Sequence, residues 1–350
     1  MASFANRYVS IAREDGGYGT VTSAATLYGF VDDENLKQTY DIVERNDMSY
    51  WAAHNSAVGK QYTEGDLNFV LQADDFCGML MYAAMGGDNA TVSSGEHVLS
   101  EKTTNDLPSL TVKVGRDDKE HTFKGMMVNR MSISATVGEY VTASFSLIGQ
   151  AEEATGSLST PDWGAGNDKS GAATVDGMHF KDSSVRFMAD TDDSIYIRSF
   201  TIELNNNLDT DNACALGSDT LTRAPIMQRR EVSGTIEFTR PLYSSTGSLN
   251  NEPTYDEMIA AGGLEDANTT YSIRLALSDG TNSSEILLYN VRYEAPQAGV
   301  SGRDVETMTT GFKAYINLDS AMGTPEAMQI DWKTANTGAG SGVDTKYSSI

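Results

Sequence analysis

The sequence predicts a mainly β protein, a β-sandwich or barrel built as tandem duplicated β domains with one short helix per domain. Three observations lead to this fold class. Residues 124–150 alternate apolar and polar side chains with the period of two that a half-buried strand shows. The second half of the chain repeats the order of strands, helix and long loop found in the first half. A Gly-, Ala-, Ser- and Thr-rich segment separates the halves.

Composition sets limits on function. The chain has 350 residues and a formal net charge of −24, with a pI near 4.4. Such a charge argues against ordinary nucleic-acid binding, because affinity for DNA depends on Lys and Arg neutralising phosphates. The two cysteines, Cys77 and Cys214, do not support a disulfide framework. We expect neither a signal peptide nor a transmembrane helix, since no apolar run is long enough.

The alternating segment 124–150 is predicted to be two long strands joined by a turn at Gly138 and Glu139. One face of this hairpin is apolar and is expected to pack in the core. The opposite face is polar, and four of its residues are candidates for a functional surface: Ser132, Ser134, Thr142 and Ser144.

Earlier in the chain, residues 7–20 begin as a short strand, and residues 22–31 resemble a second one. Residues 37–64 form a long, polar segment that nevertheless carries large apolar or aromatic side chains, among them Tyr40, Ile42, Val43, Tyr50 and Trp51. Loops of this length inside compact domains are uncommon and usually functional. We interpret this segment as a protruding arm or hairpin. The alternative is a solvated loop with a few residues tucked back on the core.

A strand is predicted at 65–71, followed by a helix at 75–85. Asp74 or Asp75 would cap the helix, and the Gly86-Gly87 pair would end it. A further strand at 109–114 leads through a charged turn into the hairpin of 124–150. The predicted division is a first β domain at 1–150, a linker at 151–175, a second β domain at 176–318 and a C-terminal extension at 319–350.

The second half repeats this plan. Strands are expected at 195–204, 231–239, 271–277, 286–293 and 311–316, with a final strand-like piece at 328–332. Residues 254–263 carry a capping box, Thr254 to Glu257, and predict the second helix. The long loop 205–230 occupies the place of the first arm and contains the apolar residues Leu208, Leu221 and Ile226. In the strand 231–239, Glu237 and Thr239 extend the polar pattern.

No motif for catalysis or for cofactor binding is recognised, so no enzyme activity, cofactor or metal is expected. The four histidines His54, His97, His121 and His179 lack the spacing of a metal site or a catalytic triad. Acidic clusters occur at Asp190, Asp192 and Asp193 and at Asp209 and Asp211. Both lack the full oxygen-ligand pattern of a calcium loop, so solvated loops are the favoured interpretation over Ca²⁺.

The order of these motifs resembles the tail tube, or major tail, proteins of long-tailed, siphovirus-like viruses. The resemblance is carried by IAREDGGYGT, ENLKQTYDIVERND, FKGMMVNRMSISATVGEYVTASFSLIG, SFTIELNNNL and RREVSGTIEF, and it covers roughly residues 7–318. It implies a structural virion protein of a non-contractile tail, with copies that polymerise into stacked rings and form the hollow tube for genome ejection.

The resemblance also implies partners and location. The chain would contact itself, tape-measure, tail-terminator and tail-tip proteins, and viral DNA that passes without specific binding; no membrane is involved. It would be assembled in the host cytoplasm and reside in the virion tail. Family rings contain six barrel domains, so two domains per chain imply a homotrimeric, pseudo-hexameric ring. If the second half instead decorates the tube, the ring would be a hexamer.

Within that scheme, two sets of residues become candidate sites. The long loops would reach the next ring through Tyr40, Ile42, Val43, Tyr50, Trp51, Leu208, Leu221 and Ile226. The lumen would be faced by Ser132, Ser134, Thr142, Ser144, Glu237 and Thr239, with acidic residues repelling DNA from the wall. An ordinary half-exposed sheet would show the same alternation.

Other functions fit parts of the pattern. A receptor-binding or adhesin module would use the long loops as a binding surface, and related tube-like folds occur in baseplate and hub proteins. A β-rich glycosidase would need an acid/base pair of carboxylates, and the sequence singles out none. Polymerisation is the property that separates a tube protein from the adhesin and the enzyme.

Overall fold

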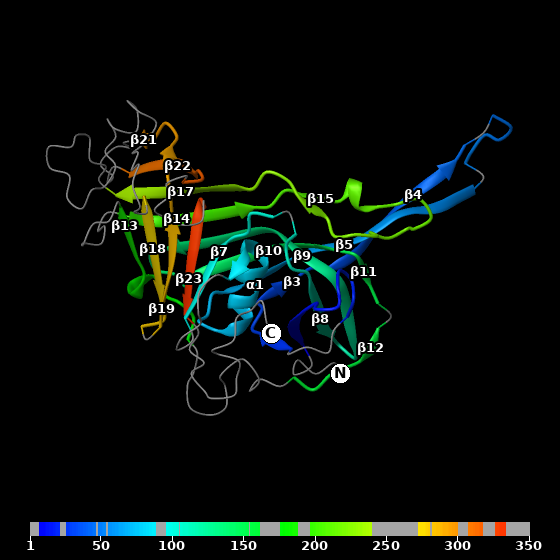
Figure 1. The fold of residues 1–350 in the computed structure, drawn as a ribbon, viewed down its shortest axis with the longest axis horizontal. Helices are drawn as coiled ribbons and strands as arrows, with labels where there is room; N and C mark the ends of the chain where they lie inside the picture. The colour runs from blue at the N-terminus through cyan, green and yellow to red at the C-terminus, as the bar shows by residue number, and fades with distance from the viewer. Residues whose placement is uncertain are drawn as a thin grey trace.

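The computed structural model describes residues 7–21, 26–46, 48–53, 55–88, 96–104, 106–153, 155–161, 176–187, 197–239, 272–280, 282–299, 307–317 and 326–333. In these parts the chain is mainly β, as predicted, with one α-helix, α1 (Asp75–Met85) (Figure 1). The strands are β1 (Tyr8–Arg13), β2 (Leu27–Gly29), β3 (Asp33–Glu34), β4 (Lys37–Arg45), β5 (Asn55–Val70), β6 (Gly86–Asp88), β7 (Glu96–Glu101), β8 (Leu110–Arg116), β9 (Lys119–Thr136), β10 (Thr142–Gly149), β11 (Ala151–Glu152), β12 (Gly156–Ser157), β13 (Ser184–Phe187), β14 (Ile197–Asn205), β15 (Leu208–Asp209), β16 (Ile226–Met227), β17 (Glu231–Thr239), β18 (Ile273–Ser278), β19 (Ser283–Leu288), β20 (Val291–Tyr293), β21 (Gln297–Gly299), β22 (Thr307–Ala314) and β23 (Met328–Lys333).

Strands from both halves of the chain form one large antiparallel sheet. Six of its strands lie side by side in the order β5–β10–β9–β14–β17–β22, and we call this part the central sheet. The first half supplies β5, β10 and β9, and the second half supplies β14, β17 and β22. The halves meet where β9 pairs with β14 over seven residues, from Thr136 opposite Ser199 to Arg130 opposite Asn205.

The alternation of side chains along these strands explains why the sheet has one buried face. Leu67, Phe145, Ile133, Ile202, Ile236 and Phe312 point to the same side and are almost fully buried. Phe69 and Phe145 stack with ring centroids 5.6 Å apart. Burial of this apolar face is the main stabilising contribution of the sheet, because each large side chain contributes roughly 1.5–3 kcal/mol when removed from water.

Helix α1 and a second sheet contribute to the core together with the central sheet. The second sheet has six strands in the order β13–β18–β19–β23–β7–β6, so it too mixes strands from both halves. Every residue of α1 is buried, and the helix lies against β9 of the central sheet and β7 of the second sheet. Trp332 of β23 is buried and donates its indole N–H to the carbonyl of Asp74, 3.1 Å away, just before the helix begins.

The caps of α1 are those that the sequence predicts. The carboxylate of Asp74, not Asp75, accepts a hydrogen bond of 2.8 Å from the backbone N–H of Cys77. At the other end, Gly86 has φ of 88° in the left-handed region, and its N–H donates to the carbonyl of Tyr82. Glycine is favoured there because other residues resist this backbone conformation.

Some predicted elements differ from the structure. The predicted strand 286–293 is two strands, β19 and β20, in different sheets, because Asn290 between them adopts φ of 44°. The predicted linker 151–175 begins with β11 and β12, which both pair with β9. Part of the predicted extension, 328–332, is β23 and lies between β19 and β7.

Other predictions fall outside the described residues. They are the second helix at 254–263, most of the linker, the acidic cluster at 190–193, His54 and the tail from 334 to 350. Among the described strands, neither large sheet closes into a barrel, because the strand order of each sheet ends at an edge strand on both sides.

Candidate functional site

The outer surface of the central sheet is a continuous polar face that crosses all six strands. All six residues proposed from the sequence as lumen-facing lie on it, because the pairings place Thr142 opposite Ser134, and Ser144 opposite Ser132. Glu237 and Thr239 follow on β17 in the same register. We define the polar face as Asp66, Asn68, Arg130, Ser132, Ser134, Thr136, Thr142, Ser144, Ser146, Ser199, Thr201, Glu203, Asn205, Glu231, Ser233, Thr235, Glu237, Thr239, Thr307, Thr309 and Lys313.

Hydroxyl groups dominate this face, and one pair of them interacts across two strands. The hydroxyls of Ser134 and Thr201 lie 3.3 Å apart, on either side of the junction between the halves. Arg130 donates to the carboxylate of Glu203 across the same junction, at 2.6 Å. The charge of Arg130 is thereby balanced. The residues of the polar face are half-buried or exposed in one chain, and they offer polar groups to solvent over the whole width of the sheet.

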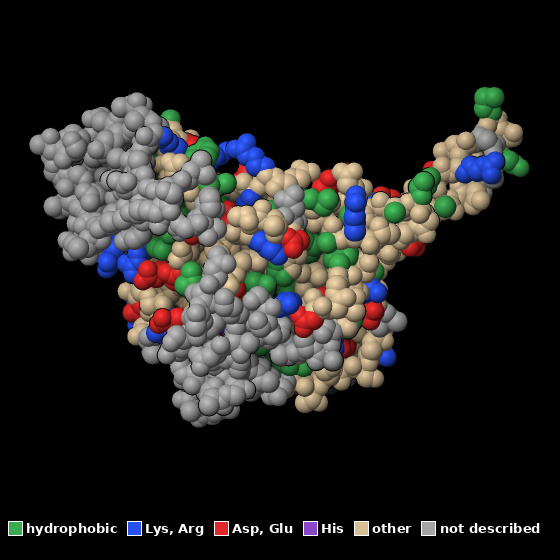
Figure 2. All heavy atoms as spheres, in the orientation of Figure 1, with side chains coloured by type: hydrophobic (Ala, Val, Ile, Leu, Met, Phe, Trp, Pro, Cys, Tyr) green, Lys and Arg blue, Asp and Glu red, His purple; other side chains and the backbone are tan. Residues whose placement is uncertain are grey.

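The predicted arm is a two-stranded hairpin. β4 pairs with the first part of β5, from Lys37 opposite Glu64 to Arg45 opposite Asn55. Figure 1 shows it projecting well beyond the rest of the fold. The five apolar residues singled out in the sequence are all more than half exposed, and Trp51 is 100% exposed. Figure 2 shows hydrophobic side chains along the arm as far as its tip.

An isolated hairpin is at best marginally stable in water, and apolar side chains of this size are normally buried. The arm therefore has the character of a surface that is completed by another molecule. The sequence indicated this arm because a long polar segment contains several large apolar residues.

The second long loop lies against the base of the arm. The Lys60 ammonium contacts the Asp211 carboxylate at 2.9 Å, and the Gln61 side-chain amide donates to Asp219 at 2.9 Å. The backbone N–H of Gln61 also donates to the carbonyl of Asp219. Sequence reasoning did not anticipate that the two loops would touch within one chain.

The three residues of the second loop that were proposed as contacts differ in their exposure. Ile226 is exposed, Leu208 is half-buried where β15 pairs with β16, and Leu221 is 0% exposed. The side chain of Leu221 is therefore inside its own chain rather than at a surface. The carbonyl of Leu221 accepts a hydrogen bond of 2.7 Å from the side chain of Gln150, which holds the loop in place.

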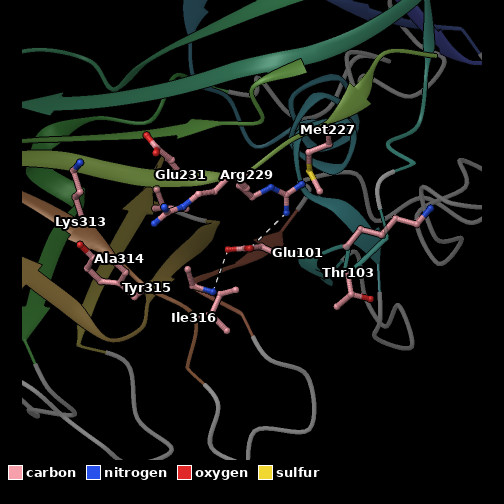
Figure 3. A pocket seen from close by; sticks show the side chains of 13 residues that line it. Glu101, Thr103, Met227, Arg229, Glu231, Lys313, Ala314, Tyr315 and Ile316 are labelled. Atoms are coloured by element: carbon pink, nitrogen blue, oxygen red, sulfur yellow. Dashed lines mark hydrogen bonds and ion pairs between the residues drawn. The ribbon is translucent and has the colours of Figure 1, made fainter. Parts of the chain in front are cut away.

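A groove of about 670 Å³ lies where the loop joins β17 (Figure 3). Glu101 and Arg230 line it with their side chains 11% and 7% exposed, and Arg230 Nη1 lies 3.6 Å from Glu101 Oε2. Burial raises the pKa of Glu101, although Arg230 opposes this, and burial lowers the pKa of Arg230, although Glu101 opposes it. Arg230 also donates to the side-chain oxygen of Asn206 and to the last carbonyls of α1. This cluster joins the two halves, so a structural role accounts for it.

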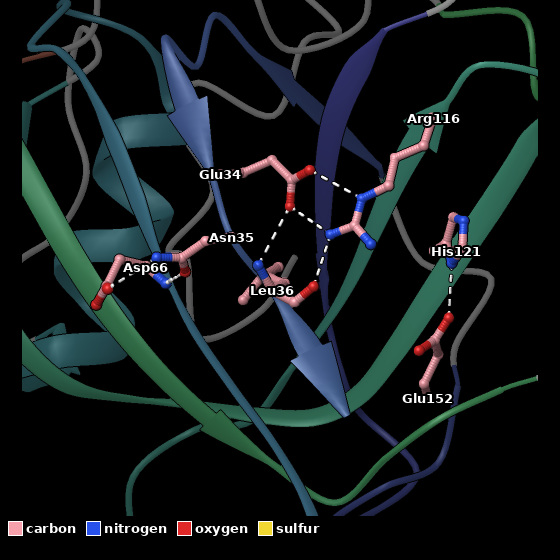
Figure 4. A network of polar contacts seen from close by, with 7 residues as sticks. All are labelled: Glu34, Asn35, Leu36, Asp66, Arg116, His121 and Glu152. Atoms are coloured by element: carbon pink, nitrogen blue, oxygen red, sulfur yellow. Dashed lines mark hydrogen bonds and ion pairs between the residues drawn. The ribbon is translucent and has the colours of Figure 1, made fainter. Parts of the chain in front are cut away.

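A second groove, of about 560 Å³, lies beside β3 and is lined by residues 7–9, 29–34 and 114–117. We call it the β3 groove. Figure 4 shows how the end of β3 is held: Arg116 donates to both carboxylate oxygens of Glu34 and to the carbonyl of Leu36, at 2.6–2.9 Å. The Glu34 carboxylate also accepts the Leu36 N–H, at 3.3 Å. The hydrogen bonds to Glu34 raise the pKa of Arg116.

Within the described residues, no group of three or more acidic, His or Cys side chains is arranged to hold a metal ion. In the same residues, no helix has the length and apolar character required to cross a membrane. The candidate surfaces are the polar face, the arm and the β3 groove.

One known family matches this chain. A family model described as phage tail tube protein matches residues 5–314. Comparison with curated proteins finds no match. The matched range contains the polar face, the arm, the loop against the arm and the β3 groove.

Proposed function

Because that match covers most of its length, the chain belongs to the phage tail tube protein family, and we propose that its copies assemble into stacked rings that form a hollow tube for viral DNA. The role is structural rather than catalytic, and it needs no cofactor. The observation that carries the proposal is the polar face, which runs without interruption across strands from both halves.

We propose that the polar face lines the lumen. A wall for passing DNA must stay solvated without binding phosphate, and Ser and Thr hydroxyls meet that requirement. The face has few cations, and Arg130 is already paired with Glu203. The sequence suggested a wall of carboxylates, whereas this face is mainly hydroxyl. Repulsion of DNA then comes largely from the net charge of −24 carried by each chain.

We propose a ring of three chains. Each chain would contribute two sheet segments, β5–β10–β9 and β14–β17–β22, and three chains would supply six segments. The arrangement supports this over a hexamer, because the second-half strands extend the same polar face instead of lying on its outside. We propose that residues 1–150 and 176–318 are duplicated domains whose strands join in one sheet.

We propose that the arm reaches the next ring along the tube, where its apolar side chains would be buried. Tyr40, Ile42, Val43, Tyr50 and Trp51 would form this contact, with Leu208 and Ile226 near its base. Tape-measure, terminator and tail-tip proteins are the expected further partners in a virion of the siphovirus-like, non-contractile type.

Electron microscopy of the purified protein at rising concentration, in low and high salt, tests the proposal. Hollow tubes of stacked rings are expected. Chains that remain monomeric at every concentration and also remain monomeric when tail-tip proteins are added would contradict it. That outcome would favour the second candidate, a receptor-binding module, for which the exposed arm is the supporting observation.

A further inference from the structure

The described strands of the two halves pair in the same order. In the first half the order is β5–β10–β9–β8–β1. In the second half β17 pairs with β22 and β22 with β20, while β19 pairs with β18 and β18 with β13. The long strand β9 thus corresponds to β19 and β20 together, and β21 continues β20 along β22.

Where the halves meet, the end of β9 fills a groove in the second half. The Val137 N–H donates to the Arg198 carbonyl at 3.0 Å, which extends the β9–β14 pairing by one residue. The space left at this junction is about 80 Å³. It is lined by residues 135–137 from the first half and by residues of β13, β14 and β18 from the second.

The β3 groove has the corresponding position in the first half, but no described segment of the second half fills it. Its lining comes from the start of β1, residues 29–34 and the end of β8, which correspond to the β13, β14 and β18 parts of the junction. Its volume is about 560 Å³ against about 80 Å³ at the junction. Within the described residues, no second-half segment lines it.

The segment that would fill this groove lies at the opposite end of the central sheet. β20 and β21 pair with β22 on one side, and the described strands include none on their other side. An unpaired sheet edge is a template for pairing with another chain. Within the described residues, one chain therefore carries both the β3 groove and the edge that corresponds to the segment filling the junction.

We infer that the β3 groove receives the β20–β21 edge of a second copy of this chain, and that this contact reproduces between copies the β9–β14 junction within one chain. The inference rests on the proposed function and specifies its lateral contact. A head-to-tail contact of this kind closes into a ring when the rotation between copies divides a full turn.

The register follows from the internal junction. Ser134 lies opposite Thr142 of β10, and Gln297 lies opposite Thr309 of β22. On the other side, Thr201 lies opposite Thr235 of β17. When Phe145 of β10 is matched with Phe312 of β22, Thr142 corresponds to Thr309, and Asn68, opposite Ser144, corresponds to Thr235, opposite Gly311. Asp33 lies opposite Asn68 and therefore corresponds to Thr201.

Since Ser134 pairs with Thr201 inside the chain, Asp33 is expected opposite Gln297 of the neighbouring copy. The Gln297 amide can donate to the Asp33 carboxylate. The backbone groups of Leu36 are already bonded to Arg116 and Glu34, so the pairing between copies should stop before this residue.

Disulfide crosslinking tests the contact in the full-length chain with Cys214 replaced by Ser. Asp33→Cys together with Gln297→Cys is expected to give covalent dimers and trimers on oxidation, because directly opposed residues have Cβ atoms about 5 Å apart. Ser134→Cys with Thr201→Cys is the matched control and is expected to crosslink within one chain and remain at monomer mass. Each single-cysteine variant should give no trimer.

A groove-filling variant gives an independent readout. Asp32 is exposed and lines the groove, so Asp32→Trp should raise the concentration needed for ring formation at least tenfold. Asp118→Trp, at an exposed position in the β8–β9 turn outside the groove, should leave it unchanged.

Two results together would overturn this contact while leaving the tube proposal standing. Asp32→Trp would form rings at the same concentration as the parent, and the variant with Asp33→Cys and Gln297→Cys would give no crosslinked dimers or trimers. Failure of the parent chain to form any ring would overturn both.

Discussion

Glu326 is buried, and its replacement by Gln should make the protein more stable above neutral pH. Its side chain is 5% exposed, and one carboxylate oxygen has no hydrogen-bond partner among the described residues. Burial, reinforced by the nearby Glu101 carboxylate, raises the pKa of Glu326 from 4.5 to about 7. The folded protein therefore holds this proton to a higher pH than the unfolded chain does.

The sign and size of the effect follow from this shift. Below pH 4.5 the carboxyl is neutral in both states and costs nothing. Stability is then lost as the pH rises towards 7, because the unfolded chain ionises freely and the folded one does not. The full difference between 4.5 and about 7 corresponds to about 3 kcal/mol. Glu326→Gln keeps the shape of the neutral group and removes this loss.

Urea unfolding at pH 4, 6 and 8, followed by the fluorescence of buried Trp332 at concentrations too low for assembly, measures the difference. We expect the variant to match the parent at pH 4 and to exceed it by up to about 3 kcal/mol at pH 8. Glu139→Gln, at an exposed turn, is the control and should change little at any pH. A difference between Glu326→Gln and the parent that does not change with pH would refute the reasoning.

Three further predictions concern packing and assembly. Phe145→Ala should cost about 3–5 kcal/mol in the same unfolding assay, because the ring is fully buried and stacked on Phe69; a loss below about 1 kcal/mol would contradict the described core. Arg230→Ala should cost about 3–5 kcal/mol because Glu101 would remain largely buried without its cation. If Glu101→Gln lowers the unfolding free energy of the parent and of Arg230→Ala by the same amount, the two residues are not paired. Trp51→Ser should change the stability of the single chain by less than about 0.5 kcal/mol, since this residue is fully exposed. It should also weaken stacking at least tenfold in sedimentation, and unchanged stacking would contradict the role of the arm.

Local patterns in the sequence predicted the strands well, because alternation is a property of neighbouring residues. The hairpin of β9 and β10 turns at Gly138 as predicted, and Gly138 has φ of 96°. The apolar face of β17 is likewise the one that the alternation of Ile236 and Phe238 indicates. The face on which the six lumen candidates lie follows from the same rule, and the structure places all six on one surface.

The partners of those strands were not predictable in the same way. Period-two alternation specifies which face is buried but not which strand lies beside it. Nothing local to 328–332 indicates that β23 would enter a sheet between β19 and β7. The sequence contained one indication of the break between β19 and β20. Asn290 lies there, and Asn tolerates positive φ more readily than most residues.

The candidate site was likewise predictable where a local pattern marks it, and not where it depends on residues distant in sequence. The arm was predictable because its apolar residues stand out in a polar segment. Leu221 was not, since a single leucine in a polar loop has no period, and its burial depends on how the loop folds onto the arm and Gln150. The β3 groove could not be predicted at all, because it is formed by three segments that are distant in sequence.

The most direct test of the central claim is a cryo-electron microscopy reconstruction of the assembled tube. The account predicts three chains per ring, with Ser134, Thr201 and Glu237 facing the lumen and the arm contacting the next ring. A tube in which this polar face points outward, or in which the lumen is lined by other strands, would contradict it.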